Sequence, residues 1–228
     1  MANVLIVGAS RGIGLGLVRR YLDGGHTVFA VARKLAGAAG LTELASQHRG
    51  RLTLIEADLT DTGVAAQLSD ALAQRKLDIL IVNAGIKPDS DDYAQLDAGQ
   101  IARLFATNAL APMALARALA PRIADGGVAA FLSSQMGSVA LARSASLPLY
   151  GASKAALNSL MQSWAAEQGS LRFALLALHP GWVRTDMGGQ GADIGVDESV
   201  AGLVATIDAH AGRPVCAFVD YRNQTLAW

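Results

Sequence analysis

One stretch near the amino terminus decides the fold: Val4-Leu5-Ile6-Val7-Gly8-Ala9-Ser10-Arg11-Gly12-Ile13-Gly14-Leu15-Gly16. The continuous apolar run at its start is typical of a strand that is buried on both faces of a parallel sheet. Leu15, Val18 and Leu22 then recur at helical spacing, so the glycines stand where a strand gives way to a helix. We therefore predict a strand, a glycine turn and a helix in succession.

The glycine turn is a candidate phosphate-binding site. The amino end of a helix presents unpaired N–H groups and the positive end of the helix dipole, and glycines let a pyrophosphate approach them closely. The spacing Gly-x-x-x-Gly-x-Gly differs from the commonest dinucleotide fingerprint, Gly-x-Gly-x-x-Gly. A Walker loop is excluded because no Gly-Lys-Ser/Thr follows. The alternative is that small residues merely permit a tight turn and close packing of the helix on the sheet.

Composition limits the remaining possibilities. A chain of 228 residues with 52% hydrophobic and 17% charged residues suits one α/β domain whose sheet is covered on both faces. Nineteen basic and nineteen acidic residues give no net charge, and hence no electrostatic reason to expect nucleic acid or an anionic membrane. The single cysteine, Cys216, excludes an intrachain disulfide and a cysteine-based zinc site, and the histidines show no metal-ligand spacing. With no leader or membrane-spanning pattern, we expect a cytoplasmic protein that binds no metal.

Further apolar runs predict the rest of the sheet. The ranges expected to form strands after the first one are 26–32, 51–57, 77–82, 128–132, 172–178 and 215–219. Thr60 or Asp61 is expected to cap the helix after the third strand. A long alanine-rich helix should run through 101–115, with Gly126-Gly127 separating it from the fifth strand, and a last helix should begin near Asp197.

Polar residues follow several predicted strands at the end where open α/β sheets bind ligands. After the second strand, an acidic residue would suit the ribose of NAD, whereas Arg33, with Arg11 in the glycine turn, suits the 2′-phosphate of NADP(H). Either arginine could instead be an ordinary solvated side chain. Asp58 follows the third strand and could cap a helix or bind an adenine amine. Asn83 follows the fourth strand and is either a turn former or a polar support beneath a cofactor.

A phenol and an ammonium share one face of a predicted helix. Tyr150 and Lys154 stand at positions i and i+4, and a nearby cation favours ionisation of a tyrosine, whose ordinary pKa is ~10. Such a pair can donate and accept a proton nearer neutrality, although a plain surface pair is the alternative. Asn108 is a polar residue on the apolar side of the long helix and needs partners if it is buried. The glycine-rich range 188–195 is either a lid or a surface loop.

With these residues assembled, the sequence resembles the short-chain dehydrogenase/reductase family across essentially its whole length. Four motifs occur in the family's order: Gly8-Ala9-Ser10-Arg11-Gly12-Ile13-Gly14, Asn83-Ala84-Gly85, Ser134 with Tyr150-Gly151-Ala152-Ser153-Lys154, and Pro180-Gly181. The segments 133–138 and 179–187, with the closing Trp228, look more narrowly like the C-factor and sniffer-like carbonyl reductases.

The resemblance implies a single doubly wound Rossmann-type α/β domain over residues 1–228, with a mostly parallel seven-stranded sheet and helices on both faces. It implies an NADP(H)-dependent oxidoreductase, with NAD(H) the less favoured cofactor, that reduces a ketone or aldehyde or oxidises the alcohol. Ser134 would bind the substrate oxygen, Tyr150 would pass it a proton, and Lys154 would hold the nicotinamide ribose while lowering the pKa of Tyr150. Asn108 would hold the water of a proton relay. The cofactor supplies the hydride, and the protein orients the reactants.

The same resemblance extends the list of cofactor contacts. Asp58 would contact adenine, and Pro180, Val183 and Thr185 would flank the nicotinamide amide. The expected cofactor-binding residues are Gly8, Ser10, Arg11, Gly12, Ile13, Gly14, Arg33, Asp58, Leu59, Asn83, Ala84, Gly85, Tyr150, Lys154, Pro180, Gly181, Val183 and Thr185. The choice of Ser134 over Ser133 or Ser138 rests mainly on the Ser-x-x-Gly that Ser134 begins.

Family habit suggests a homodimer or homotetramer acting on a small carbonyl or alcohol substrate, with no nucleic-acid or membrane partner. A non-catalytic dinucleotide sensor or signalling protein of C-factor type is the main alternative. It would need only the glycine turn, so the intact set of Ser134, Tyr150, Lys154 and Asn108 argues against it. A methyltransferase or another Rossmann-like enzyme would leave the Tyr150 and Lys154 pair unexplained.

Overall fold

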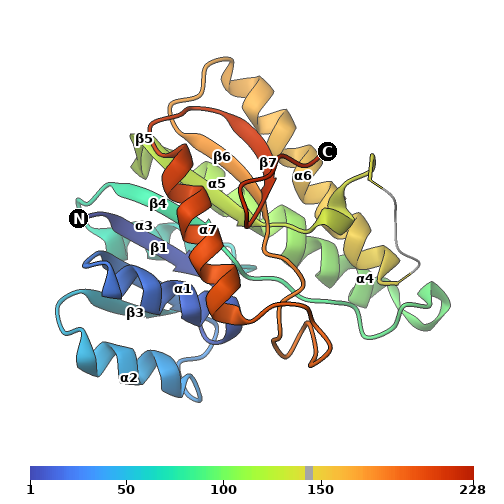
Figure 1. Ribbon diagram of the computed structural model, residues 1–228, viewed down its shortest axis with the longest axis horizontal. Coiled ribbons are helices and arrows are strands. Elements are labelled where there is room, and N and C mark those ends of the chain that lie inside the picture. Colours follow the sequence, from blue (N-terminus) through green and yellow to red (C-terminus); the bar gives the residue numbers. More distant parts are fainter. Residues whose placement is uncertain (142–145) are drawn as a thin grey trace.

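A seven-stranded sheet lies between two layers of helices in the computed structural model, which describes residues 1–141 and 146–228 apart from the side chain of Tyr93 (Figure 1). The strands are β1 (Asn3–Val7), β2 (Thr27–Ala32), β3 (Leu52–Glu56), β4 (Leu77–Val82), β5 (Ile123–Leu132), β6 (Ala174–His179) and β7 (Cys216–Asp220). Their order is β3-β2-β1-β4-β5-β6-β7, and every neighbouring pair is parallel. The predicted doubly wound α/β fold is confirmed. The strand order reverses between β1 and β4, and open α/β sheets bind ligands at such a reversal.

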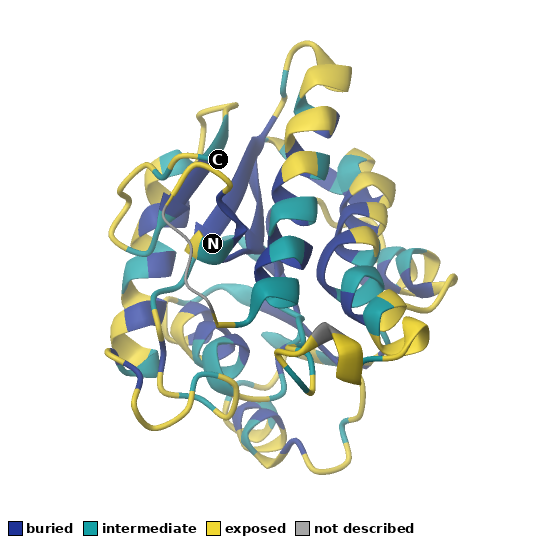
Figure 2. Cartoon of the chain, turned by 90° about the vertical axis from the view of Figure 1, so that its right-hand side faces the viewer, coloured by how far each residue is buried: buried dark blue, intermediate teal, exposed yellow. Residues whose placement is uncertain are grey.

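Each face of the sheet has its own hydrophobic core. Helices α1 (Gly12–Asp23), α2 (Ala39–Gln47) and α7 (Val196–His210) cover one face, and α3 (Val64–Leu72), α5 (Ala111–Leu119) and α6 (Pro148–Gln168) cover the other. Helix α4 (Ala98–Phe105) packs against α6. In β1, Val4 and Ile6 join the first core while Leu5 and Val7 join the second. This alternation explains why β1 is apolar at successive positions. Buried residues accordingly lie along the sheet and the inward sides of the helices (Figure 2).

Strand β5 begins earlier than the sequence predicts, at Ile123 instead of residue 128. Gly126, with a φ of +77°, and Gly127 lie inside the strand, where its pairing with β4 shifts register between Leu77 and Ile79. A Cβ at Gly127 would lie 2.8 Å from the carbonyl oxygen of Asp78. The glycine pair is therefore an irregularity that lets two strands approach closely, and its interpretation as a boundary was wrong.

One helix was missed and two expectations about helices were wrong. Helix α2 was not predicted, because only Leu41 and Leu44 are buried on it and no side chain caps it. Helix α3 begins after Gly63 without a side-chain cap, so neither Thr60 nor Asp61 plays that part. The predicted long helix is also interrupted: a π-helical turn, η2 (Ala106–Leu110), separates α4 from α5.

Candidate active site

The glycine turn presses against the segment that follows β4. A Cβ at Gly8, whose φ is +88°, would lie 2.6 Å from the backbone nitrogen of Ala84, and a Cβ at Gly14 would lie 2.1 Å from the carbonyl oxygen of Gly8. The side-chain amide of Asn83 donates a hydrogen bond to that same oxygen, at 2.6 Å. Asn83 thus fastens the end of β4 to the turn, which agrees with a supporting role beneath a cofactor.

The amino end of α1 is open to an anion. Arg11 is the N-cap residue, but its side chain makes no capping hydrogen bond. The backbone N–H of Leu15 donates a hydrogen bond to the carbonyl oxygen of Arg11. The preceding N–H groups, those of Gly12, Ile13 and Gly14, therefore have no side-chain cap, and Ser10 leads into the same turn. The backbone N–H donors, the positive end of the helix dipole and the lack of side chains on the glycines together suit the pyrophosphate of a dinucleotide.

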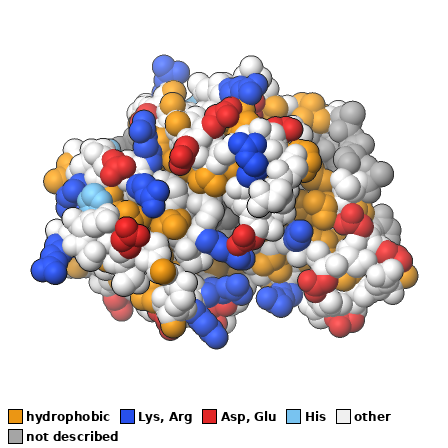
Figure 3. Space-filling model, turned by 60° about the horizontal axis from the view of Figure 1, so that its bottom comes forward, with side chains coloured by type: hydrophobic (Ala, Val, Ile, Leu, Met, Phe, Trp, Pro, Cys, Tyr) orange, Lys and Arg blue, Asp and Glu red, His pale blue; other side chains and the backbone are white. Residues whose placement is uncertain are grey.

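Basic side chains surround the ends of β2 and β3. Arg33 is exposed directly after β2, and Asp58 follows the neighbouring strand, with Leu59 buried beside it. Hydrogen bonds from the N–H and hydroxyl of Thr60 lower the pKa of Asp58, and the positive charges of Arg33 and Arg103 lower it further. In the view of Figure 3, lysine and arginine side chains lie near the middle of the face with aspartate and glutamate side chains among them. The charges of Arg33 and Arg103 suit a phosphate better than the neutral hydroxyls of a ribose.

Lys154 and Tyr150 lie on α6 where it passes the ends of β4 and β5. The Lys154 side chain is buried, and its ammonium donates to the carbonyl oxygen of Leu132 at 2.7 Å. The same nitrogen lies 5.7 Å from the centre of the Tyr150 ring and 3.4 Å from where a Cβ would stand at Gly85. A phenol and an ammonium that are separated from Gly85 by a long stretch of chain therefore meet beside it.

The pKa of Tyr150 differs from the expectation. Burial raises the pKa of Tyr150 to about 12 and lowers the pKa of Lys154 to about 8. The prediction of a lowered pKa for Tyr150 was therefore wrong for this structure, in which burial sets the direction of the shift. Desolvation of the phenolate dominates, and the ammonium is directed to the Leu132 carbonyl.

Ser134 is the serine whose hydroxyl proton is uncommitted. Its oxygen accepts a hydrogen bond from the backbone of Met136 at the start of η4 (Gln135–Gly137), and it donates to no acceptor in the described part of the chain. In contrast, the hydroxyl of Ser133 donates to buried Asn158 at 2.7 Å, and that of Ser138 donates to the Trp228 carbonyl at 3.2 Å. Of these three hydroxyls, that of Ser134 is the one able to donate to a substrate, and its choice as the substrate-binding serine stays a prediction.

Asn108 lies in the π-helical turn η2 and is fully buried. Its carbonyl oxygen accepts from the N–H of Ile86, and its amide donates to the Ile86 carbonyl and to the hydroxyl of Ser153, all at 2.8 to 2.9 Å. The side chain is thus occupied by protein groups. The residue four positions after Asn108 is Pro112, which has no N–H to offer the backbone carbonyl of Asn108.

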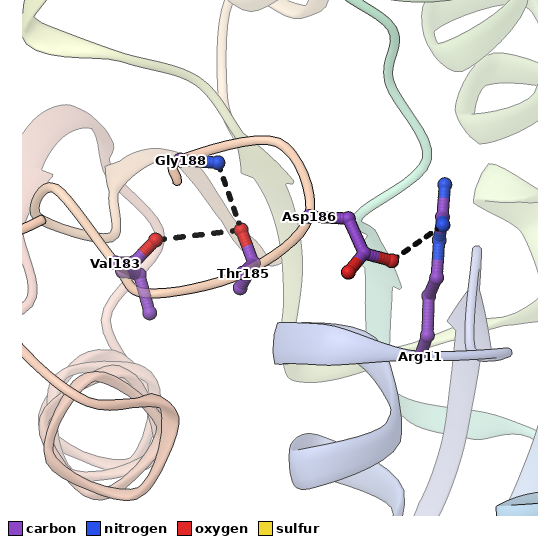
Figure 4. A network of polar contacts seen from close by, with 5 residues as sticks. All are labelled: Arg11, Val183, Thr185, Asp186 and Gly188. Carbon is purple, nitrogen blue, oxygen red and sulfur yellow. Dashed lines mark hydrogen bonds and ion pairs between the residues drawn. The ribbon is translucent and has the colours of Figure 1, made fainter. Parts of the chain in front are cut away.

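The segment after β6 lies over the glycine turn. Gly181 has a φ of +83°, and Val183 is buried and bridges to Ile194. The hydroxyl of Thr185 accepts from the backbone of Gly188 at 3.1 Å (Figure 4), while its methyl group lies 3.3 Å from where a Cβ would stand at Gly12. The carbonyl of Pro180 accepts from Ser199 on α7 at 2.6 Å, which fixes the start of the segment. Of the residues predicted to flank the nicotinamide, Thr185 therefore lies beside the turn predicted to hold the pyrophosphate.

Sequence reasoning missed several polar residues of this region. Ser153 and Asn158 were not singled out, although both lie on the inward face of α6 with Tyr150 and Lys154, and helical periodicity could have identified them. Asp186, which pairs with Arg11, stands 175 residues away in the chain, so no local pattern signals it.

Two kinds of feature are not found within 1–141 and 146–228. No helix there combines the length and apolarity that crossing a membrane requires, and no three His, Cys, Asp or Glu side chains cluster as metal ligands would.

Comparison of the sequence and the structure with known proteins identifies related chains. A family model described as short chain dehydrogenase matches residues 2–193. The C-signal protein of Myxococcus xanthus is 35% identical over 158 residues, which cover 67% of this chain and 93% of that protein. A carbonyl reductase from Pseudomonas aeruginosa, solved in complex with NADP, is 57% identical with a TM-score of 0.95, and the carbonyl reductase Sniffer of Drosophila melanogaster is 29% identical with a TM-score of 0.87. Both structural matches cover all of this chain and all of the other.

Proposed function

The chain belongs to the short-chain dehydrogenase family, and on that premise we propose that it is an NADP(H)-dependent carbonyl reductase. The reaction would convert a ketone or an aldehyde to an alcohol, or run in reverse as oxidation of the alcohol. One observation carries the proposal: the buried Lys154 ammonium lies near both Gly85 and the Tyr150 ring, and Ala84, the neighbour of Gly85, packs against Gly8 of the glycine turn that could hold a pyrophosphate. The P. aeruginosa carbonyl reductase solved with NADP supports the same cofactor and reaction.

Each polar group has a place in that reaction. When bound, a nicotinamide dinucleotide supplies the hydride that adds to the carbonyl carbon. The hydroxyl of Ser134, whose proton is uncommitted, would donate a hydrogen bond to the substrate oxygen and favour the negative charge that develops there. Tyr150 would then give its phenolic proton to this oxygen, so that the hydride and the proton together complete the alcohol.

The protonation state of Tyr150 is the one that carbonyl reduction requires. With a pKa that burial raises to about 12, the phenol carries its proton at neutral pH. After donation, the phenolate would be stabilised by the ammonium of Lys154, which lies 5.7 Å from the ring centre. The backbone carbonyl of Asn108, which lacks an α-helical donor because Pro112 follows at i+4, would hold the water that resupplies the proton. Alcohol oxidation would instead require the phenolate at the outset.

The preference for NADP(H) rests on charge at the end of β2. Arg33 stands where an acidic residue would be needed to accept hydrogen bonds from the ribose of NAD, and Arg103 adds positive charge near Asp58. NADPH should therefore bind more tightly than NADH. Arg33→Ala should remove most of that preference and leave NADH affinity unchanged; tighter binding of NADH by the parent protein would contradict the assignment.

The direct test follows the absorbance of NADPH against a panel of aliphatic and aromatic ketones and aldehydes. We expect oxidation of NADPH with at least one carbonyl class and, with Ser134→Ala, a lower turnover at unchanged NADPH affinity. Tight NADPH binding without turnover of any carbonyl or alcohol would favour a dinucleotide sensor instead. A sensor is not favoured by the structure, since it would need the glycine turn but not Ser134, Tyr150 and Lys154.

A further inference from the structure

An ion pair joins the two segments that border the open end of α1. Arg11, in the glycine turn, donates from Nη1 to Oδ2 of Asp186 at 2.5 Å (Figure 4). Asp186 belongs to residues 180–195, which connect β6 to α7 and are called here the β6–α7 loop. The pair therefore ties this loop to the turn that could hold a pyrophosphate.

Thr185, the neighbour of Asp186, lies close to Gly12, the neighbour of Arg11. The methyl group of Thr185 lies 3.3 Å from where a Cβ would stand at Gly12, so consecutive residues of the loop meet consecutive residues of the turn. The N–H of Gly12 is among those that no side chain caps at the start of α1. The loop thus reaches the rim of the anion site, at a point where no bulky side chain separates them.

Hydrogen bonds within the β6–α7 loop couple the position of Asp186 to that of its neighbours. The backbone N–H of Gly189 donates to the carbonyl of Thr185 at 2.8 Å, and the N–H of Gly188 donates to the Thr185 hydroxyl. The base of the loop is held by a hydrogen bond from the Arg184 N–H to the Ile194 carbonyl at 2.9 Å. Because these bonds fix the loop internally, Asp186 and Thr185 should move together.

Arg11 has donors to spare for a second partner. A guanidinium carries several N–H donors, and Asp186 takes up Nη1, while the other nitrogens of Arg11 bond to no acceptor in the parts of the chain described. One guanidinium can therefore hold the Asp186 carboxylate and a phosphate of the dinucleotide at the same time.

We propose that Asp186 is a positioning residue that closes the β6–α7 loop on bound dinucleotide through Arg11 and thereby slows release of the cofactor. The proposal needs the dinucleotide binding of the proposed function but not carbonyl reduction. Both side chains are largely exposed, at 75% for Arg11 and 72% for Asp186, so water and salt screen the pair. An exposed pair of this kind corresponds to a change of about 1.4- to 5-fold in a rate or an equilibrium.

The test measures release of NADPH and of NADH by stopped-flow fluorescence without substrate. Asp186→Asn keeps the size of the side chain and removes its charge. We expect both cofactors to leave about threefold faster from this variant at low salt, with the difference shrinking at high salt. In an Arg11→Gln background, Asp186→Asn should cause no further acceleration, because the partner charge is already gone.

Asp125→Asn is the matched control. Asp125 forms an exposed ion pair with Arg172 near the starts of β5 and β6, at the opposite end of the strands from the glycine turn. Its loss should leave both release rates unchanged. A general effect of removing a surface carboxylate would appear in this control and would overturn the proposal.

Hydrogen exchange supplies a readout without any cofactor. The amides of Gly188 and Gly189 should exchange faster in Asp186→Asn than in the parent and at the parental rate in Asp125→Asn. Parental release rates in Asp186→Asn, or equal acceleration with and without Arg11, would refute the closing role. If the parent binds NADPH yet reduces no carbonyl, the proposed function fails while these measurements still decide the role of Asp186.

Discussion

Lys154→Met tests what it costs the fold to bury the ammonium of the proposed active site. Burial lowers the pKa of Lys154 from 10.5 to about 8. At about 1.4 kcal/mol per pKa unit, the charged form is disfavoured in the folded state by roughly 3 kcal/mol. Methionine removes this penalty but leaves the carbonyl of Leu132 without its donor, which costs about 1–3 kcal/mol. At pH 7 we therefore expect the variant to be between equal to and about 2 kcal/mol more stable than the parent.

The pH dependence separates these two contributions. Below about pH 8 the folded and unfolded chains both hold the Lys154 proton, and the penalty is present in full. Between about 8 and 10.5 only the unfolded chain binds it, so the stability of the parent rises with pH relative to the variant. Above 10.5 both states are neutral and the penalty has vanished. Tyr150 and Cys216 titrate at high pH too, but both proteins contain them.

The assay is urea unfolding of parent and variant at a series of pH values. Lys76→Met is the control, because the Lys76 ammonium also donates to a carbonyl, that of Pro121, but from an exposed position. This control removes an ammonium and its hydrogen bond without changing a buried group. Turnover should fall about 10²- to 10⁴-fold in Lys154→Met while remaining intact in Lys76→Met. A stability difference for Lys154→Met that stays constant from pH 7 to above 10.5 would refute the burial argument.

Three other substitutions test separate parts of the account. Gly14→Ala should abolish dinucleotide binding in calorimetry, because the new Cβ would lie 2.1 Å from the carbonyl oxygen of Gly8. Gly63→Ala is the control and should bind as the parent does, because no atom lies within 4 Å of its new Cβ. Equal binding by the two variants would contradict the packing of the turn. Asn108→Leu should lower the free energy of unfolding by about 2–4 kcal/mol, since the N–H and C=O of Ile86 both lose a partner, and unchanged urea stability would contradict this. Spectrophotometric titration of parent and Tyr150→Phe should differ by a phenol that ionises near pH 12, and loss of a phenol that ionises below pH 10 would show that burial does not dominate.

The sheet could be predicted because each of its strands carries a local signal. Strands covered on both faces need apolar residues at successive positions, and β1 and β4 show this pattern over nearly their whole length. Glycine is ambiguous by the same local reasoning: Gly126 and Gly127 look like a break between elements but lie within β5. Helix α2 was missed because two buried leucines are too few to establish a helical period.

The candidate site could be predicted where a motif repeats a family pattern. It could not be predicted where residues far apart in the sequence come into contact. Tyr150 and Lys154 were predicted from helical spacing and the resemblance. The direction in which the pKa of Tyr150 shifts depends on burial, which residue spacing does not reveal. The pairing of Arg11 with Asp186 joins residues 175 positions apart, and only the folded chain brings them together. These residues remain predictions as site residues until they are tested.

Proton donation by Tyr150 is the central claim, and single-turnover kinetics of Tyr150→Phe test it most directly. NADPH is bound first, its dissociation constant is measured, and its oxidation is then followed after mixing with a carbonyl that the parent reduces. The account predicts an unchanged dissociation constant and a rate of hydride transfer that falls by about 10²- to 10⁴-fold. A rate equal to that of the parent would contradict it.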